Sequence, residues 1–330
     1  MSDPLVTAFI PSYNKARFVE AALESVSRQA FRDFEFIIID DCSTDGSRDV
    51  IASWIERSGF NCRFIEHRVN QGVCKTCNEV VALAKGKYLA GPGADDLWHP
   101  EFLRRMVEVM EELPDDTAMV YCDAERIDED GRRQPLTELE THVGFLPRPH
   151  GKVFHSLLAV NYIPALAALT RLDCIRALGG YDEGLFVEDW DMHLRLAEKY
   201  DIAFLPERLA QYRILSDSMS RSPESRAEML QARRQTLLKW VGYDRRADEL
   251  IDRTLGDLPA ALYQARHPAA RHYVARRLRR RGRLRDLVML ACLVAKVPYP
   301  GFQALDRLAV RLKAAGRTML APVQCREEPR

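Results

Sequence analysis

Residues 5–10 (Leu-Val-Thr-Ala-Phe-Ile) run directly into residues 11–14 (Pro-Ser-Tyr-Asn), and this change from an apolar run to a polar turn decides the fold. The change recurs where residues 34–39 (Phe-Glu-Phe-Ile-Ile-Ile) lead into residues 40–47 (Asp-Asp-Cys-Ser-Thr-Asp-Gly-Ser). Strands that are apolar on both faces are typical of a parallel sheet that helices cover on each side. Because a helical pattern over 16–29 separates the two runs, we predict an α/β fold with a mostly parallel, doubly wound sheet.

The other elements of the first hundred residues repeat at about the length of a βαβ unit. Their patterns predict strands at 62–65 and 88–90 and helices at 47–57 and 73–84. From residue 101 the pattern is mixed: we predict strands at 118–123, 164–170 and 202–205, helices at 101–113, 174–178 and 190–199, and a polar loop at 128–152. After about residue 222 only helices rich in Arg, Ala and Leu are predicted, so this region is a helical C-terminal extension.

The charge of the chain is divided between its two parts. The 330 residues hold 48 Lys and Arg against 48 Asp and Glu, with 47% hydrophobic residues, and this composition excludes collagen-like, low-complexity and strongly disordered proteins. Residues 1–220 hold 24 basic and 37 acidic side chains (24 − 37 = −13), whereas residues 221–330 hold 24 and 11 (24 − 11 = +13). We therefore expect the C-terminal part to meet an anionic partner.

The absence of recognisable targeting signals in the sequence predicts a cytoplasmic protein. The first residues lack the basic and apolar regions of a signal peptide, no apolar run reaches the roughly 18 residues of a membrane span, and eight Cys in this length do not form a disulfide scaffold. Cys74-x-x-Cys77 has no second pair of ligands at zinc-site spacing, so we interpret it as two small side chains on a packed helix.

Polar turns follow all four predicted strands of the first hundred residues. They are 11–14, 40–46, 70–72 (Asn-Gln-Gly) and 91–96 (Gly-Pro-Gly-Ala-Asp-Asp). Ligands of open α/β sheets bind at the carboxyl ends of the strands, so a single site is expected there. No Gly-x-Gly-x-x-Gly follows the first strand and no P-loop is present, which argues against a dinucleotide-binding protein and a P-loop NTPase.

Two adjacent carboxylates, Asp95 and Asp96, end the fourth turn. Such a pair suits a hard divalent cation, Mg²⁺ or Mn²⁺, and the cation in turn suits a diphosphate. The same two residues could instead favour the dipole of the helix that follows, and their spacing alone leaves both interpretations open.

Further motifs continue this series. In chain order the motifs are Pro11-Ser12-Tyr13-Asn14, Asp40-Asp41-x-Ser43-Thr44-Asp45-Gly46-Ser47, Asn70-x-Gly72, Asp95-Asp96-x-Trp98-x-Pro100, Gly179-Gly180-Tyr181-Asp182, Glu188-Asp189-x-Asp191-x-x-x-Arg195, and Tyr212-Arg213 followed by Ser218 and Ser220. This ordered set, which covers about residues 4–220, resembles the inverting GT-A glycosyltransferases of family 2. The resemblance implies a GT-A fold and a metal-dependent transferase of the hexosyltransferase type that takes its sugar from a nucleoside diphosphate.

The resemblance also implies roles for residues of this chain. Asp41 would bind the nucleobase, flanked by Pro11 and Tyr13. Asp95, with Asp96 beside it, would hold the metal, and Asp189, with Glu188, would form the catalytic acidic pair in which Asp189 is the general base. A carboxylate is apt there, because an inverting displacement needs a base on the face opposite the departing diphosphate. Asp191 and Arg195, four residues apart, are interpreted as a pair on the helix surface.

The remaining candidate ligands of the donor are turn residues and two cations. Asn14, Asn70 and Gly72 belong to the turns, Lys75 follows them closely enough to meet a phosphate, and Arg213 could hold the leaving diphosphate. The donor is expected to carry UDP or dTDP, since uracil and thymine present the same imide edge to a carboxylate. The acceptor is expected to be a hydroxyl of a glycan or a lipid-linked glycan in surface polysaccharide assembly.

Two departures from the family pattern leave an alternative open. Gly93 stands where the family usually has the first Asp of Asp-x-Asp-Asp, and Leu215 where members often have His. Both favour a non-catalytic relative that binds nucleotide sugar or glycan as a scaffold, whereas the retained acidic residues favour an enzyme. A nucleotidyltransferase would need a Gly-rich basic loop after the first strand, which is missing.

The organisation is therefore predicted as three parts: 1–100 binding the nucleotide sugar, 101–222 binding the acceptor, and 223–330 forming a basic helical region. Nine Arg lie between 266 and 285, and an apolar stretch at 287–295 ends at Lys296. A basic stretch joined to a short apolar stripe is typical of an interfacial helix, so 266–296 is expected to meet an anionic membrane surface, peripherally on the inner face of the cell membrane. A dimer interface or a solvated Arg face is the alternative. Nucleic acid is not expected, because Tyr273 is the only aromatic residue within the Arg run.

Overall fold

A computed structural model of the chain describes residues 3–142, 148–215, 225–281 and 284–308. The chain separates into two compact units, residues 1–247 and 248–330, which we describe one at a time. The predicted functional boundaries at residues 100 and 222 stay predictions, because compactness does not tell which segment binds donor or acceptor. Ser218 and Ser220 of the last motif, part of the polar loop at 143–147, and Arg283 lie outside the described residues.

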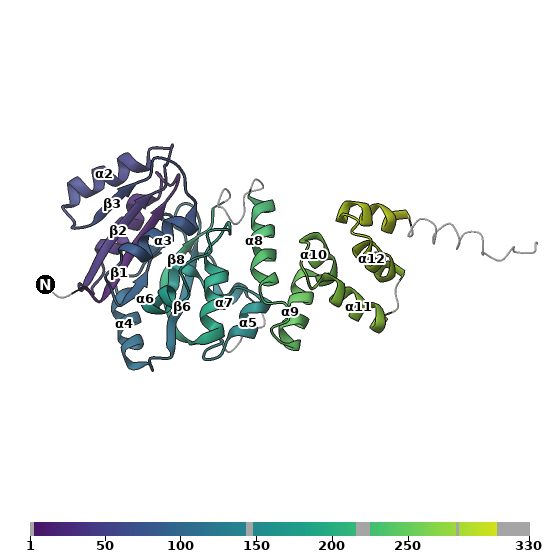
Figure 1. The fold of residues 1–330 in the computed structure, drawn as a ribbon. Helices are drawn as coiled ribbons and strands as arrows, with labels where there is room; N and C mark the ends of the chain where they lie inside the picture. The colour runs from purple at the N-terminus through teal and green to yellow at the C-terminus, as the bar shows by residue number, and fades with distance from the viewer. Residues whose placement is uncertain (1–2, 143–147, 216–224, 282–283, 309–330) are drawn as a thin grey trace, which may run out of the picture. The chain divides into compact units, whose positions relative to one another are not determined.

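An eight-stranded mixed sheet forms the centre of the first unit, with strand order β3-β2-β1-β4-β7-β6-β8-β5 (Figure 1). The strands are β1 (Val6–Ser12), β2 (Phe34–Asp40), β3 (Arg63–Glu66), β4 (Tyr88–Ala90), β5 (Leu97–Trp98), β6 (Thr117–Ile127), β7 (Ala168–Arg171) and β8 (Asp201–Arg213). β1 to β4 are parallel to one another, β7 is antiparallel to both β4 and β6, and β8 pairs parallel with β6. The α/β fold with its parallel first half is thereby confirmed.

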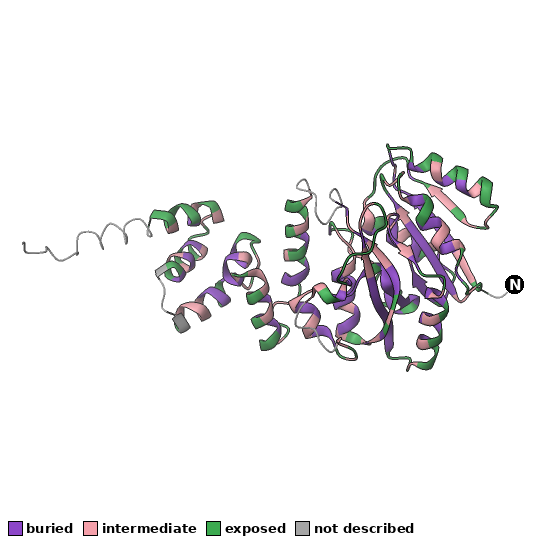
Figure 2. Ribbon diagram, turned by 180° about the vertical axis from the view of Figure 1, so that it is seen from behind, coloured by how far each residue is buried: buried purple, intermediate pink, exposed green. Residues whose placement is uncertain are grey.

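Helices cover both faces of this sheet. They are α1 (Val19–Ser27), α2 (Ser47–Ser58), α3 (Val73–Leu83), α4 (Phe102–Glu112), α5 (Phe154–Ala159), α6 (Leu172–Ala177), α7 (Asp189–Lys199) and α8 (Arg226–Leu238). α1 contacts α2, β1 and β5, and α4 contacts β6 and β8, whereas α3 contacts β1 and α6, and α7 contacts α5, α6 and β8. Figure 2 shows the consequence, buried strands between helices whose outer faces are exposed.

The buried faces follow from the sequence periodicity. Val19, Ala22, Leu23 and Val26 recur at helical spacing and are fully buried in α1, and the last five residues of β2 are all buried. Removing such apolar surface from water is the main stabilising contribution to a core of this kind.

The second half of the sheet differs from its sequence-based prediction. The strand expected at 202–205 continues to Arg213, because β8 pairs along β6 through a register shift at Asp123. The segment expected as a strand at 164–170 begins as a 3₁₀ turn at Ala165–Ala167, and the two-residue strand β5 was not predicted. Irregular register and very short strands leave little periodicity in a sequence.

The second unit is helical. It contains α10 (Leu258–Gln264), α11 (Ala270–Arg281) and α12 (Leu284–Val294), follows on from α9 (Arg245–Leu255), and residues 299–308 are also helical. Its core is formed by apolar residues from these helices: Ala260, Tyr263, Val274, Met289, Cys292 and Phe302. None of the helices within the described ranges is long and apolar enough to span a membrane.

Candidate active site

A cavity of about 900 Å³ opens at the carboxyl ends of β1, β2 and β4, in the first unit. Parallel pairing brings these strand ends to one edge of the sheet, so turns that are distant in the sequence meet there. All twelve candidate site residues line this cavity: Pro11, Tyr13, Asn14, Asp41, Asn70, Gly72, Lys75, Asp95, Asp96, Glu188, Asp189 and Arg213. Their individual roles stay predictions, but the expected convergence of the turns is observed.

The Asp41 side chain is held rigidly at the end of β2. Its Oδ1 accepts hydrogen bonds from the backbone N–H of Gln71 at 2.8 Å and from His67 Nδ1 at 2.7 Å, and its Oδ2 accepts one from the N–H of Gly72 at 2.8 Å. The other ring nitrogen of His67 lies 2.8 Å from Glu79 Oε2. Although burial lowers it, the hydrogen bonds to Asp41 and Glu79 raise the pKa of His67 above its ordinary value. His67 was not predicted, because a lone His carries no sequence signal.

Asn14 joins the first two turns. It adopts a positive φ of 53°, its side-chain oxygen accepts a hydrogen bond from the N–H of Thr44 at 2.8 Å, and its own N–H donates to Ser43 Oγ at 2.9 Å. Asn is one of the few residues that adopt this left-handed conformation easily. Tyr13 lines the cavity with 47% of its surface exposed, and Lys75, another lining residue, is exposed near the start of α3.

Asp95 and Asp96 converge on the position of the missing family carboxylate. A Cβ at Gly93 would lie 2.9 Å from Asp96 Oδ2 and 3.0 Å from Asp95 Oδ1, so the two carboxylates fill the space that a side chain would need. Lys15 Nζ, which the sequence analysis missed, pairs with Asp95 Oδ2 at 2.8 Å. Burial, with a further contribution from the Asp95 charge, raises the pKa of Asp96 well above its ordinary value.

Asp95 and Asp96 could supply two carboxylate ligands to an ion such as Mg²⁺. They do not form a site in which the protein supplies every ligand. Mg²⁺ sites commonly use one or two carboxylates and take the remaining ligands from water and substrate phosphates. No group of three or more His, Cys, Asp or Glu side chains suitable for a metal is found among the described residues. Asp95 and Asp96 would therefore hold a cation together with a bound diphosphate.

Arg213 links the loops around Asp95 and Asp96 by hydrogen bonds. Its backbone N–H donates to Asp96 Oδ1 at 2.8 Å, its Nε to the carbonyl of Asp95 at 2.8 Å, and its Nη1 to the carbonyls of Asp128 and Glu129 at 3.0 and 3.2 Å. The side chain is buried, and its guanidinium stacks over the ring of Phe18. Leu215, the second departure from the family pattern, is fully buried two residues further on.

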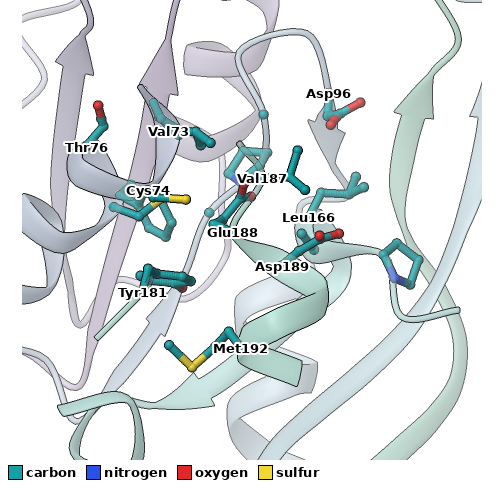
Figure 3. Close-up of a pocket in the computed structure, with 18 of the residues that line it drawn as sticks. Val73, Cys74, Thr76, Asp96, Leu166, Tyr181, Val187, Glu188, Asp189 and Met192 are labelled. Atoms are coloured by element: carbon teal, nitrogen blue, oxygen red, sulfur yellow. The ribbon is translucent and has the colours of Figure 1, made fainter. Parts of the chain in front are cut away.

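Glu188 and Asp189 lie on another wall of the same cavity, at the start of α7; Figure 3 draws them with Asp96 among the lining residues. Asp189 Oδ1 accepts a hydrogen bond from the N–H of Trp190 at 2.6 Å, and Oδ2 accepts one from Asn161 Nδ2 at 2.9 Å. Burial and the neighbouring Asp189 charge raise the pKa of Glu188 to about 7. Two carboxylate pairs thus line one cavity, Asp95 with Asp96 and Glu188 with Asp189.

Comparison with known proteins identifies the family. The model of the family described as Glycosyl transferase family 2 matches residues 7–171, which is half of the 330 residues. The chain belongs to glycosyl transferase family 2. The match includes the turns of Asp41 and of Asp95 and Asp96 and ends before Glu188.

Relatives of this family 2 glycosyltransferase agree with the assignment. An uncharacterized glycosyltransferase of Rickettsia typhi is 24% identical over 221 residues, 64% of each chain. A Bacillus subtilis glycosyltransferase assigned by name to teichuronic acid biosynthesis, TuaG, is 35% identical over 109 residues, 33% of this chain and 43% of that protein. The alignments therefore span less than two thirds of the length of these relatives.

Solved structures confirm the predicted GT-A fold of the family 2 glycosyltransferase. S. aureus TarS 1–349 in complex with UDP has a TM-score of 0.53 at 16% identity, covering 87% of this chain and 80% of that one. The mannosyltransferase PcManGT from Pyrobaculum calidifontis, in complex with GDP-Man and Mn²⁺, has a TM-score of 0.55 at 20% identity, covering 95% of this chain and 86% of that one.

On α7, one prediction needs correction. Asp191 and Arg195 do form an ion pair, at 2.8 Å, but Asp191 is only 2% exposed, and Lys239 also pairs with it at 2.6 Å. The pair is therefore internal and does not lie on the helix surface, because α8 packs over this side of α7. A buried ion pair needs good hydrogen bonding to offset the free-energy cost of removing both charged groups from water.

The Cys74-x-x-Cys77 pair lies on the buried face of α3. Both thiols are 3% exposed, and Cys74 Sγ donates to the carbonyl of Leu185 at 3.3 Å. Burial raises the pKa of Cys74 to about 12 and that of Cys77 well above its ordinary value, so neither is poised to form a thiolate. The expectation of two small packed side chains is confirmed.

Proposed function

We propose that the protein is an inverting glycosyltransferase that moves a sugar from a nucleoside diphosphate to a hydroxyl group. The observation that carries the proposal is the shared cavity: Asp95 and Asp96 enter it from the loop after β4, and Glu188 and Asp189 enter it from α7. A donor bound between these walls would present its diphosphate to one carboxylate pair and its anomeric carbon to the other. The two carboxylate pairs are far apart in the sequence, so their meeting at one cavity favours a shared function over a role in folding.

In this reaction Asp189 acts as the general base. Two hydrogen bonds, from Trp190 and Asn161, fix its carboxylate, which takes the proton of the acceptor hydroxyl as that oxygen attacks the sugar. Asp95 and Asp96 would hold Mg²⁺ or Mn²⁺, which offsets negative charge on the leaving diphosphate. Lys15, paired with Asp95, supplies a positive charge at the same wall, and Arg213 keeps the two acidic residues in place.

Asp41 is proposed to bind the nucleobase. Three donors already use its carboxylate, and an ionised carboxylate offers about four acceptor positions, so one Oδ2 position is left for an imide N–H of the base. This favours UDP or dTDP as the leaving group. The solved relative TarS, which was captured with UDP and with UDP-GlcNAc, supports a uridine donor, whereas the GDP-Man complex of PcManGT makes guanosine the competing outcome.

A donor panel tests this proposal. Thermal unfolding is measured with UDP-, dTDP- and GDP-sugars, each with Mn²⁺ and with EDTA. The expected result is stabilisation by one uridine or thymidine donor that depends on Mn²⁺, followed by release of the nucleotide. Stabilisation without any release would support the non-catalytic scaffold, which the Lys15–Asp95 pair and Gly93 favour. Absence of stabilisation by every donor contradicts both.

The acceptor is proposed to be a growing surface glycan or a lipid-linked glycan. The support is that TuaG is named for teichuronic acid biosynthesis and a second relative, WcaA of Escherichia coli, for colanic acid biosynthesis. Such acceptors are found at membranes, which is consistent with a peripheral site of action on the inner face of the cell membrane.

The surface of the second unit supports membrane contact. Besides Arg285, α12 exposes the apolar residues Leu287, Ala291 and Val294, of which Leu287 and Val294 have 53% and 63% of their surface exposed. Leu305 and Leu308 are exposed as well. The same unit also exposes four cations: Arg271, Arg279, Lys296 and Arg307. An apolar helix face with cations beside it is suited to the interface of an anionic bilayer.

A further inference from the structure

Two polar side chains that take no part in the proposed chemistry lie beside Asp189 and line the same cavity. Asn161 Nδ2 donates to Asp189 Oδ2 at 2.9 Å, and Asn161 Oδ1 lies 3.1 Å from Nδ1 of His193, which is 3% exposed. Asn161 comes from the loop after α5, and His193 from α7, one turn beyond Asp189. The three side chains form a hydrogen-bonded chain along the cavity wall, from the buried His193 to Asp189.

The chemistry of the groups fixes the position of each proton. An ionised carboxylate only accepts hydrogen bonds, so Asn161 must turn its amide N–H₂ toward Asp189 and its oxygen toward His193. His193 must then carry its proton on Nδ1. Burial lowers the pKa of His193 more than the charge of Asp189 raises it, and the ring is therefore neutral near pH 7. Every hydrogen bond in the chain then points toward Asp189.

The helices on either side hold this chain in place. α5 packs on α7, and the indole Nε1 of Trp190 donates to the carbonyl of Leu157 in α5 at 2.8 Å. This hydrogen bond joins Trp190, the residue after Asp189, to α5, the helix that precedes Asn161. The geometry of the loop is therefore set by the same helix that carries the carboxylate.

We propose that Asn161 and His193 are positioning residues for the general base: His193 orients the Asn161 amide, and the amide holds the Asp189 carboxylate ionised and oriented to accept the proton of the acceptor hydroxyl. The inference rests on the proposed function, since it concerns the base of that reaction. The other titratable groups that face Asp189 are its neighbour Glu188, Cys74 of α3, and Tyr181. None of these has a hydrogen bond to Asn161 in the described residues.

The consequence is a shift in the pH dependence of the reaction. A donor that bonds only to the ionised carboxylate favours ionisation, so its removal makes Asp189 protonate at a higher pH. A general base fails when it is protonated. The acid limb of the pH–rate profile should therefore move to higher pH when Asn161 is changed, by about one pH unit for one hydrogen bond to a charged group.

The experiment measures nucleotide release with water as the acceptor, using the donor that the panel selects, between pH 5 and pH 9. Asn161→Leu keeps nearly the size of the side chain but can neither donate to Asp189 nor accept from His193. Asn161→Ala removes both contacts. We expect both to lower kcat roughly tenfold or more, to move the acid limb upward, and to leave the dissociation constant of the nucleotide unchanged.

His193 is tested through Asn161. His193→Phe should reproduce the shift, and it should add nothing in the Asn161→Ala background, because its effect passes through the amide. His155→Phe is the matched control, since His155 has a similar bond to Asp244 at 2.8 Å outside the cavity lining, and its profile should equal that of the wild type.

The outcomes separate the two levels of the proposal. A wild-type protein that releases nucleotide from no donor at any pH overturns the proposed function and the inference with it. A working wild type whose acid limb is unchanged in Asn161→Leu and Asn161→Ala, or additive effects of the Asn161 and His193 variants, overturn the inference alone. Circular dichroism shows whether each variant has the native fold.

Discussion

At the scale of single residues, Glu188 makes the stability of the protein depend on pH. Burial and the charge of Asp189 raise the pKa of Glu188 from its ordinary value of 4.5 to about 7. The folded protein thus binds this proton more tightly than the unfolded chain does. Its stabilising contribution is complete below about pH 4.5 and is lost as the pH rises to about 7.

Glu188→Gln should remove this loss, because the amide stays neutral at every pH. Above pH 7 the variant should exceed the wild type in free energy of unfolding by about 1–3 kcal/mol, and below pH 4.5 the two should agree. Urea unfolding at pH 4.5 and pH 8 measures the difference. The same difference at both pH values would contradict the raised pKa of Glu188.

The base assignment is tested at the neighbouring residue. Asp189→Asn keeps the shape of the side chain but cannot take a proton, so nucleotide release should fall by about 10²-fold or more while the dissociation constant of the nucleotide is unchanged. Asp182→Asn is the control, because Asp182 pairs with Lys239 and is not part of the cavity lining. Retained activity in Asp189→Asn would exclude Asp189 as the base.

Which of these residues a sequence can reveal depends on how local their signal is. Asp41, Asp95 and Asp96 follow strands whose apolar runs are plain in the sequence, so their shared edge could be predicted. Lys15 and Asn161 could not, because their roles arise from contacts with Asp95 and Asp189 across long sequence separations. The burial of Asp191 could not be predicted either, because it involves an ion pair with Lys239, at the end of α8 and far away in the sequence.

At the scale of elements, β8 supports the loop of Asp95 and Asp96 through Arg213. Arg213→Ala should destabilise the protein by about 2–4 kcal/mol, because it leaves the carbonyls of Asp95, Asp128 and Glu129 without their shared donor. Denaturant unfolding measures this, and Mn²⁺-dependent donor binding should weaken with it. Arg208→Ala, on the same strand, removes only an exposed pair with Glu140 at 3.6 Å and should leave stability almost unchanged.

A result in which both arginine variants behave alike would contradict this role of Arg213.

The sequence analysis underestimated the length of β8. Between Leu205 and Leu209 the strand changes register against β6 and alternates buried with exposed residues irregularly, so no period of two marks it. The regular helices α1 and α3 agree with their predictions to within a few residues, because their buried residues recur at helical spacing.

At the scale of the whole chain, the charge division first noticed in the sequence gives the second unit its proposed partner. The net charge of +13 in residues 221–330 could be predicted by counting, but which arginines face solvent could not. Arg277 is 15% exposed and pairs with Asp257 and Asp286, whereas Arg271 and Arg279 are exposed. The charge available to a membrane is therefore smaller than the count suggests.

Binding to lipid vesicles tests the proposed contact. The full-length protein should sediment with vesicles of phosphatidylcholine and phosphatidylglycerol at low salt and be released at 500 mM salt, because the attraction of surface cations is screened within about 5 Å at that ionic strength. The double variant Leu287→Gln/Val294→Gln, which changes two exposed residues of α12, should bind roughly tenfold more weakly. Val69→Gln/Leu230→Gln, which changes equally exposed residues of the first unit, is the control and should bind like the wild type. Equal sedimentation with neutral and anionic vesicles, or none with either, would contradict the membrane proposal and leave the transferase proposal unaffected, because the donor cavity lies within residues 1–247.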